Sequence, residues 1–332
     1  MEYPKISIVT PSYNQGQYLE QTIDSVLSQN YPNLEYFVVD GGSNDNSKQI
    51  IEKYAKHLTW WVSEKDDGQS HAINKGLKRA TGDIVNWINS DDYYEPHALE
   101  HVAAAFQDGK TNMACFRANV FGTERRISPG TTIFEGNLPK TIAFSRIDQP
   151  ETFFSMEAVK KMGLLNENLH YCMDKEWLMR YLFHYGLEGI KRSEEIILNF
   201  RYHKASKSMS QQDGFYEESD LIYLSYAKAF KVQRGFDVLE SQLSGKRNID
   251  ARGIIIPSCV EERLAKDMLN CYLFKRAIEH YEQLSLKVFL ELAGAVDSKR
   301  LSKEDASFLH SLRSRARIFP KPALSLIRRI TR

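Results

Sequence analysis

Polar residues suited to binding a nucleotide diphosphate follow three apolar stretches in the first hundred residues. KISIVT leads into Thr10–Asn14, LEYFVVD leads into Asp40–Asp45, and DIVNWIN leads into Asn89–Asp92. In order, these segments supply an aromatic ring, a carboxylate beside two glycines, and a carboxylate pair. A ring can stack on a base, a carboxylate can bind a ribose, and a carboxylate pair can hold a divalent cation on a diphosphate.

The adjacent carboxylates Asp91 and Asp92 are the sharpest of these signals. Two neighbouring carboxylates at the end of a buried strand repel each other and are costly to desolvate unless a cation or a hydroxyl compensates them. Mg²⁺ and Mn²⁺ are commonly held by a carboxylate, with phosphate oxygens and water in the other positions. The alternative is a helix N-terminus, because Asp before Tyr-Tyr-Glu-Pro also suits capping. The residues alone leave both interpretations open.

Other phosphate-binding signatures are missing from the sequence. It contains neither GxGxxG nor GxxxxGK[ST], which removes the main support for a dinucleotide site or a P-loop. Gly41–Gly42 alone indicates only a turn. The segment PSYNQGQ contains no Lys or Arg, which argues against a sugar-phosphate nucleotidyltransferase, because that chemistry needs a basic, glycine-rich phosphate loop near the first strand.

Alternating strands and helices must position the polar segments. Strand-like and helix-like hydrophobic patterns alternate over the first ninety residues, which predicts right-handed βαβ crossovers and a largely parallel sheet. In such a sheet, ligands bind at the carboxyl ends of the strands, where the polar segments lie. The expected strands span residues 5–10, 34–40, 59–62 and 83–89, and the expected helices span 17–28, 47–57 and 69–80.

The rest of the chain is expected to be irregular at first and then helical. Strand-like pieces at 113–121 and 196–200 flank a helix at 175–185, and helical patterns follow at 215–233, 260–292 and 303–316. We therefore expect an α/β domain over residues 1–212 and a helical C-terminal region over residues 213–332. An oligomer could form through this helical region.

Charge is distributed unevenly along the 332 residues. Lys and Arg number 44 against 43 Asp and Glu, and the net charge of +1 argues against a nucleic-acid-binding protein. Lys299–Arg332 contains ten basic and two acidic residues and carries +8, so the preceding 298 residues carry −7. The four cysteines form no CxxC pair, and no signal peptide or long apolar run is visible, which predicts free thiols in a cytoplasmic protein.

The basic tail has the pattern of an amphipathic helix. Between residues 306 and 332 there are seven basic residues and no acidic residue. Helical spacing puts the apolar side chains on one arc and the arginines opposite, which favours contact between residues 311–332 and the anionic inner face of a membrane. The alternative is a helix packed on the catalytic domain. The apolar arc contains Ala323, Leu324, Leu326, Ile327 and Ile330.

The polar segments resemble the ordered motifs of glycosyltransferase family 2, bacterial polysaccharide-type members above all. P-S-Y-N, V-D-G-G-S-x-D, D-x-G…A-x-N-x-G-x-x-x-A-x-G and S-D-D occur in that order within residues 5–97. Weaker similarity extends to QPETFF, MDKEW and FRYHKASKS, and ends before residue 215. The resemblance implies the glycosyltransferase-A fold, an α/β fold with a Rossmann-like, mostly parallel central sheet, here with a C-terminal helical extension.

The resemblance also implies which residues bind the donor. Pro11, Tyr13 and Asp40 would hold uracil and ribose, with the Tyr13 ring stacked on the base. Asp67 and the stretch Gly68–Lys75 would close over the nucleotide, and Asp91 would bind ribose or sugar hydroxyls. The full expected donor-binding set is Pro11, Tyr13, Asn14, Asp40, Asp67, Gly68, Lys75, Ser90 and Asp91.

The metal ligands are implied in the same way. Asp92 would ligate the Mn²⁺ or Mg²⁺ that bridges the diphosphate. His203 would add a second ligand, and Arg201, Lys204 and Lys207 around it would add positive charge. The alternative for this segment is a solvated basic loop.

The catalytic base in the family precedes a helix and often occurs as E-D. Here the matching position reads Met173–Asp174, which makes Asp174 the expected base and leaves Glu176 as its rival. Asp174 could also cap the helix that follows it. Gln149, Glu176 and Trp177 are expected to line the sugar or acceptor pocket, although core packing would explain Trp177 equally well.

Together, the resemblance implies an inverting hexosyl- or N-acetylhexosaminyl-transferase. It would move a sugar from a nucleotide donor, UDP before others, to a hydroxyl of a glycan or lipid-linked glycan by a single metal-assisted displacement. The alternative from another class is a non-catalytic nucleotide-sugar-binding subunit of a glycan-assembly complex. The presence of both Asp92 and Asp174 argues against it, because a binding subunit needs no base.

Overall fold

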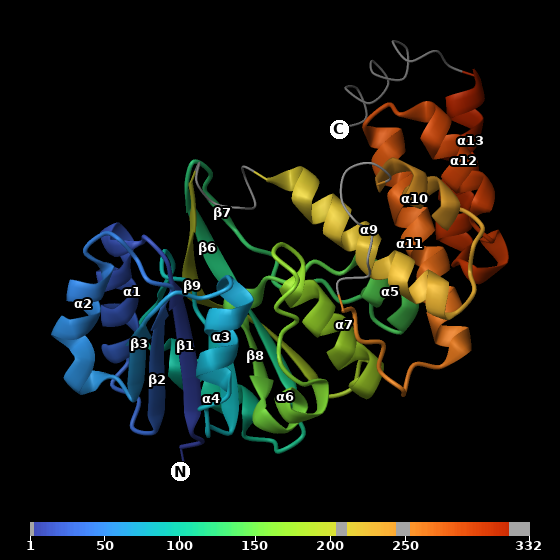
Figure 1. Cartoon of the computed structure of the whole chain (residues 1–332). Helices are drawn as coiled ribbons and strands as arrows, with labels where there is room; N and C mark the ends of the chain where they lie inside the picture. Colours follow the sequence, from blue (N-terminus) through green and yellow to red (C-terminus); the bar gives the residue numbers. More distant parts are fainter. Residues whose placement is uncertain (1–2, 204–210, 244–252, 319–332) are drawn as a thin grey trace. The chain divides into compact units, whose positions relative to one another are not determined.

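The chain forms two compact units. The computed structural model describes residues 3–203, 211–243 and 253–318, and Figure 1 labels its helices and strands. One unit comprises residues 1–132 and 146–215, and the other comprises residues 133–145 and 216–332. The first is α/β and the second is helical, so the expected fold class with its C-terminal helical extension is confirmed.

One mixed sheet forms the centre of the α/β unit. Its strands are β1 (Ile6–Ser12), β2 (Leu34–Asp40), β3 (Trp60–Ser63), β4 (Ile84–Trp87), β5 (Tyr93–Tyr94), β6 (Met113–Gly122), β7 (Arg126–Ile127), β8 (Thr152–Ser155) and β9 (Ile190–Tyr202). They lie in the order β3-β2-β1-β4-β8-β6-β9-β5, and β7 pairs with β6. The long pairings are parallel, whereas β5, β7 and β8 pair antiparallel over two or three residues. The expectation of a mostly parallel sheet is therefore confirmed.

The parallel register places the polar segments at one edge of the sheet. Ser12 at the end of β1 lies opposite Asp40 at the end of β2, and Asp40 lies opposite Ser63 at the end of β3. β4 pairs with β1 in parallel, up to Val9 opposite Trp87. The loops that follow these four strands therefore leave the sheet on the same side.

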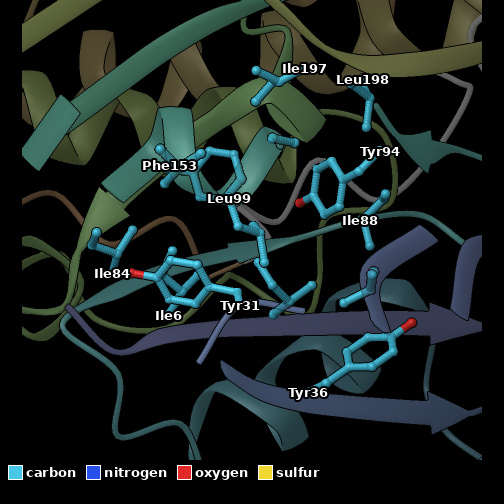
Figure 2. Close-up of a cluster of buried hydrophobic side chains, with 14 of the residues drawn as sticks. Ile6, Tyr31, Tyr36, Ile84, Ile88, Tyr94, Leu99, Phe153, Ile197 and Leu198 are labelled. Atoms are coloured by element: carbon cyan, nitrogen blue, oxygen red, sulfur yellow. The ribbon is translucent and has the colours of Figure 1, made fainter. Parts of the chain in front are cut away.

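Helices pack against both faces of the sheet. They are α1 (Gly16–Leu27), α2 (Ser47–Tyr54) with a short 3-10 turn at Ala55–His57, α3 (Gln69–Leu77), α4 (Ala98–Phe106), a second 3-10 turn at Gln149–Glu151, α6 (Met156–Met162) and α7 (Met173–Tyr185). Ile8 of β1 lies in a buried cluster with Ile23 of α1 and Leu99 of α4, and Figure 2 shows Leu99 among its neighbours. Burial of each such side chain contributes about 1.5–3 kcal/mol.

The opposite face of the sheet carries α3 and α7. A Cβ added at Gly76 of α3 would lie 2.6 Å from a methyl of Val9, so α3 approaches β1 as closely as a glycine allows. Trp177 of α7 packs against Trp87 of β4, with ring centroids 5.4 Å apart. Because successive residues of β1 point to opposite faces, Ile8 and Val9 are buried by different helices.

The strands and helices of the first ninety residues agree with the sequence prediction, and several later elements were missed. β2 has the bounds expected for it, and β1, β3, β4, α1, α3 and α7 differ from expectation by a few residues at their ends. Elements such as α4, α6 and β8 had no separate prediction. β8 lies in the stretch that the sequence pattern left irregular, and its position depends on pairing with β4 and β6. The four cysteines are free thiols, as expected.

The helical unit takes a segment from the middle of the α/β sequence. Its helices are α5 (Leu138–Phe144), α9 (Gln212–Ala229), α10 (Phe236–Leu243), α11 (Glu262–Glu282), α12 (Leu286–Ala295), a 3-10 turn at Ser298–Arg300, and α13 (Lys303–Ile318). The Phe144 ring of α5 packs on Phe274 of α11, and Lys140 Nζ lies 2.7 Å from Asp305 Oδ2. These contacts correct the continuous domains expected at 1–212 and 213–332, because residues 133–145 belong to the helical unit.

Part of the expected membrane-binding tail lies in α13. Leu309, Leu312 and Ala316 are buried within the helical unit, whereas Phe308 and Ile318 of the same helix are exposed. Residues 319–332, which include the predicted arc from Ala323 to Ile330, lie outside the described residues. In the part of the chain that the structure describes, no helix combines the length and apolarity that crossing a membrane requires.

Candidate active site

The loops after β1 and β2 are tied together by hydrogen bonds. The backbone N–H of Asn14 donates to Ser43 Oγ (2.7 Å), and Asn14 Oδ1 accepts from the backbone N–H of Asn44 (2.9 Å). Between these contacts and β1, the Tyr13 ring is 59% exposed. A fixed loop thus presents an open aromatic face at the carboxyl edge of the sheet, which suits the stacking expected of Tyr13.

Asp40 is buried at the end of β2 and organises the loop that follows. Its carboxylate accepts hydrogen bonds from the backbone N–H groups of Gly42 (3.2 Å) and Ser43 (3.0 Å), and from Ser63 Oγ (2.7 Å). Gly42 has a φ of 80°, a conformation that favours glycine. Asp40 therefore shapes the nucleotide loop, while its expected contact with uracil stays a prediction.

The structure separates two adjacent aspartates after β3. The Asp67 side chain is 86% exposed and lies 3.4 Å from His71 Nδ1. Asp66 instead lies against the β2 loop, because a Cβ added at Gly41 would be 2.6 Å from Asp66 Oδ2. The sequence prediction chose Asp67. Counting the D-x-G motif back from Gly68 identifies Asp66, so the signal for it was present in the sequence.

The start of α3 is attached to the loop after β4. Gly68 precedes the helix with a φ of 119°, and Gln69 Nε2 donates to Asn89 Oδ1 (2.9 Å). Further along the helix, Lys75 Nζ lies 2.7 Å from Glu64 Oε1. The Gly68–Lys75 stretch therefore forms most of a helix whose N-terminus lies beside the carboxylate pair.

The carboxylate pair precedes a strand and not a helix. Asp91–Asp92 leads into β5, and α4 begins later with His97 at its N-cap, so helix capping does not explain the pair. Asp92 is 1% exposed, and its carboxylate accepts from the backbone N–H of Arg201 (2.8 Å) and from Asn89 Nδ2 (3.4 Å). Burial and the neighbouring Asp91 raise the pKa of Asp92 well above the usual value. Ser90 is also buried, and its carbonyl accepts from Thr22 Oγ1.

His203 meets Asp91 and not Asp92. His203 Nε2 lies 3.0 Å from Asp91 Oδ2, and both side chains are about one-fifth exposed. Arg201 also holds the backbone at Asp91. Its Nε donates to the Asp91 carbonyl (3.0 Å), and its guanidinium lies over the Tyr18 ring. The Asp92 oxygens instead accept from the Arg201 backbone N–H and from Asn89, and the expected metal role of Asp92 stays a prediction. Lys204 and Lys207 lie outside the described residues.

Asp174 lies in the first turn of α7. The residue at the N-cap is Cys172, so Asp174 does not fill the capping position, although its Oδ1 accepts from the backbone N–H of Lys175 (2.7 Å). Burial is the main cause that raises the pKa of Asp174 to about 6. Ser70 Oγ in the first turn of α3 lies 2.7 Å from Met173 Sδ, so the base candidate begins its helix beside α3.

The three residues expected in the acceptor pocket are in the core. Trp177 is fully buried, and its Nε1 donates to the Gly163 carbonyl (2.8 Å). Glu176 is 1% exposed and pairs with Arg180 (2.7 Å), which removes it as a rival base. Gln149 Nε2 donates to the Trp87 carbonyl (2.9 Å) and to an amide of the same strand. On these contacts all three stabilise the fold, and the pocket assignment lacks support.

Comparison with known proteins identifies relatives of this chain. A chain described as an uncharacterised glycosyltransferase of Rickettsia typhi is 25% identical over 69% of this chain and 74% of its own length. The putative teichuronic acid biosynthesis glycosyltransferase TuaG of Bacillus subtilis is 38% identical over 29% of this chain and 40% of its own length.

Two solved structures share the fold at low identity. Residues 1–349 of S. aureus TarS in complex with UDP-GlcNAc superpose with a TM-score of 0.58 and 17% identity, over 94% of this chain and 88% of that one. The mannosyltransferase PcManGT of Pyrobaculum calidifontis in complex with GDP-Man and Mn²⁺ has a TM-score of 0.53 and 15% identity, over 100% of this chain and 80% of that one. These similarities establish the glycosyltransferase-A fold. The family profile described as Glycosyl transferase family 2 matches residues 7–183. Since this match spans more than half of the residues, the chain belongs to glycosyl transferase family 2.

Proposed function

We propose that this protein is an inverting glycosyltransferase that moves a sugar from a UDP-sugar to a hydroxyl of a glycan or lipid-linked glycan. One observation carries the proposal: a continuous set of contacts joins the carboxylate loop to the base. Gln69 contacts Asn89 beside Asp92, and the next residue, Ser70, contacts Met173 beside Asp174. Two adjacent residues of α3 therefore hold the nucleotide side and the base side of one site.

The donor is proposed to bind along the carboxyl edge of β1, β2 and β4. The exposed Tyr13 ring supplies a stacking surface for the base, beside Pro11 and the loop that Asp40 organises. Asp66 at Gly41 joins this set, next to the predicted Asp67. The TarS complex with UDP-GlcNAc supports a uridine nucleotide, and the name of TuaG supports an acceptor of the cell-surface polysaccharide class.

A divalent cation fits the pair Asp91 and His203. Their facing atoms are a carboxylate oxygen and an imidazole nitrogen 3.0 Å apart, and both are partly exposed. In the described residues no three His, Cys, Asp or Glu side chains gather, so diphosphate oxygens and water would complete the coordination. A mixed oxygen and nitrogen set suits Mn²⁺ better than Mg²⁺. When bound, the cation offsets negative charge on the departing diphosphate. The Mn²⁺ complex of PcManGT supports this assignment.

Asp174 is proposed as the base. Its carboxylate takes the proton of the acceptor hydroxyl while the new glycosidic bond forms on the face opposite the departing diphosphate, which inverts the anomeric centre. With a pKa of about 6, Asp174 is ionised at neutral pH and is more basic than an ordinary aspartate. A non-catalytic binding subunit would have no use for such a group.

The basic tail is proposed to bring the enzyme to an anionic membrane surface where lipid-linked acceptors lie. Arg315 and Arg317 are exposed at the end of α13, and four more basic residues follow. Deleting residues 319–332 should weaken binding to vesicles that contain anionic lipid at low salt. Equal binding by both proteins would contradict this part of the proposal.

The function is tested by incubating the protein with a panel of nucleotide sugars and Mn²⁺ and measuring release of the nucleoside diphosphate. Asp174→Asn should lower turnover by about 10²–10⁴-fold and leave donor affinity, measured by calorimetry, near the wild-type value. Asp237→Asn is a matched control, because Asp237 also accepts from the next backbone N–H in the first turn of a helix. Wild-type turnover in Asp174→Asn would disprove the base, and failure to bind any nucleotide sugar would disprove the function.

A further inference from the structure

A second carboxyl cluster in the α/β unit has no part in the site described above. It consists of Ser128 after β7, and of Asp148 and Glu151 before β8. Ser128 Oγ lies 2.5 Å from Glu151 Oε1 and 3.0 Å from Asp148 Oδ2, and the backbone N–H of Gly130 donates to the same Oγ (3.0 Å). Glu151 is 2% exposed. One hydroxyl therefore joins two carboxyl groups.

Counting protons at Ser128 shows that the two carboxyl groups differ. A serine hydroxyl has one proton to donate and two lone pairs that accept. Gly130 occupies one lone pair, so the hydroxyl can donate to one carboxyl group and can accept from the other. With both carboxylates ionised, one oxygen would face the serine oxygen with no proton between them. A proton on one of the two groups gives each of the two contacts a hydrogen of its own.

The surroundings decide which group is protonated. Arg146 Nη2 lies 2.7 Å from Asp148 Oδ2, and the Asp148 side chain is 16% exposed, so an anion is stabilised there. Glu151 is almost completely buried and has no such cation among its hydrogen-bond partners in the described residues. Burying a charge without a partner is costly, whereas burying a neutral acid that donates a hydrogen bond is not.

We propose that Glu151 is a neutral carboxylic acid at neutral pH that donates to Ser128, and that Ser128 donates to Asp148, whose carboxylate is also paired with Arg146. The protonation of Glu151 does not depend on the proposed function. Asp148 itself is fixed, since its backbone N–H donates to Thr131 Oγ1 (3.0 Å) and its carbonyl accepts from Thr152 Oγ1 (2.7 Å).

The effects of neighbouring charges and of burial agree with this order of proton donation, from Glu151 to Ser128 to Asp148. Burial, followed by the charge of Asp148, raises the pKa of Glu151 to about 8.

Further ionisable groups face Glu151 from other elements. Asp92, Tyr94 of β5 and Cys115 of β6 each lie close enough that a charge on Glu151 would raise the pKa of that group. Arg192 of β9 acts on Cys115 in the opposite direction. An ionised Glu151 would add negative charge near both Asp92 and Asp148, which is a second reason for it to keep its proton.

Infrared spectroscopy tests the protonation directly and requires no activity. At neutral pH the wild type should show a C=O band of a protonated carboxylic acid that is lost in Glu151→Gln. That variant should fold, because a glutamine amide can donate to Ser128 in place of the acid. The exposed Glu157→Gln is the control and should keep the band. In Ser128→Ala the band should shift in frequency, because its acceptor is gone. A Glu151→Gln spectrum identical to that of the wild type would overturn the proposal.

Discussion

Two buried carboxylates, one in each unit, differ in the charge of their hydrogen-bond partners. In the helical unit, Asp220 is 3% exposed and its oxygens lie 2.9 and 3.1 Å from guanidinium nitrogens of Arg276, with the Tyr272 hydroxyl at 2.6 Å. In the α/β unit, Asp92 is 1% exposed, but its hydrogen bonds come from neutral amide groups. Burial raises the pKa of both carboxyl groups, and only at Asp220 does a neighbouring guanidinium oppose this effect.

The difference shows what distinguishes a functional site from a structural ion pair. A buried carboxylate with its own cation can persist for structural reasons, and removal of the partner is then costly. Several carboxyl groups in one place without matching cations lower stability, and such groups are typical of sites that bind a cation or move a proton. The α/β unit contains both kinds, because Glu176 is paired with Arg180 and lies in the core. Charge balance, rather than burial, separates the two.

The largest expected effect is on stability, when the ion pair between Asp220 and Arg276 in the helical unit is broken. Arg276→Ala should lower the free energy of unfolding by about 3–5 kcal/mol, because Asp220 would be left buried without a cation. Urea denaturation followed by circular dichroism measures this change. Arg300→Ala is the control: Arg300 is 38% exposed and pairs with Asp267, so its removal should cost less than about 1 kcal/mol. Equal losses in both variants would contradict the comparison.

The next effect is on the pH dependence of transfer. Asp174 acts as a base only when deprotonated and has a pKa of about 6, so turnover should be level above that pH. Below pH 6 turnover should fall, approaching about tenfold per pH unit as the protonated form accumulates. Rates from pH 4.5 to 8 with saturating donor measure the midpoint. A midpoint near the ordinary aspartate value of about 4 would show that burial does not perturb this group.

A smaller effect is expected for the unpaired carboxylate itself. Asp92→Asn removes repulsion with Asp91 and can keep an acceptor for the Arg201 backbone N–H, but it loses the bond from Asn89. The free energy of unfolding should therefore change by about 1 kcal/mol or less, in contrast to Arg276→Ala. Donor binding in the presence of Mn²⁺ should weaken less in Asp92→Asn than in Asp91→Asn, as measured by calorimetry. The opposite order would return the ligand role to Asp92.

The smallest effect is expected at Lys75. Its partner Glu64 is largely exposed, so Lys75→Met should leave the melting temperature nearly unchanged. If Lys75 also meets the donor, as the family motif predicts, affinity for the nucleotide sugar should fall by up to about tenfold. The comparison change Lys48→Met removes a more exposed ion pair, with Glu52, on α2. Equal donor affinity in both variants would assign Lys75 a purely structural role.

Much of the α/β fold could be predicted from sequence because its signals are local. An apolar stretch such as Leu34–Asp40 and the periodic α3 carry their own pattern, and both appear where expected. The segment 133–145 was placed in the wrong unit because its assignment depends on packing against α11, more than a hundred residues later. Local patterns contain no information on such contacts.

Some features of the candidate site also follow from the sequence, and others depend on tertiary contacts. The residue types, their order and their place at the ends of β1, β2 and β4 follow from the sequence, because strand ends of a parallel sheet share one edge. The partner of His203 did not follow from it, since Asp91 and Asp92 are adjacent and only the turn between them decides which carboxylate points outward. The state of Glu151 likewise depends on Ser128 and Arg146. The sequence determines which ionisable groups are present, and the tertiary structure decides their charge, because protonation depends on burial and on distances between residues far apart in the chain.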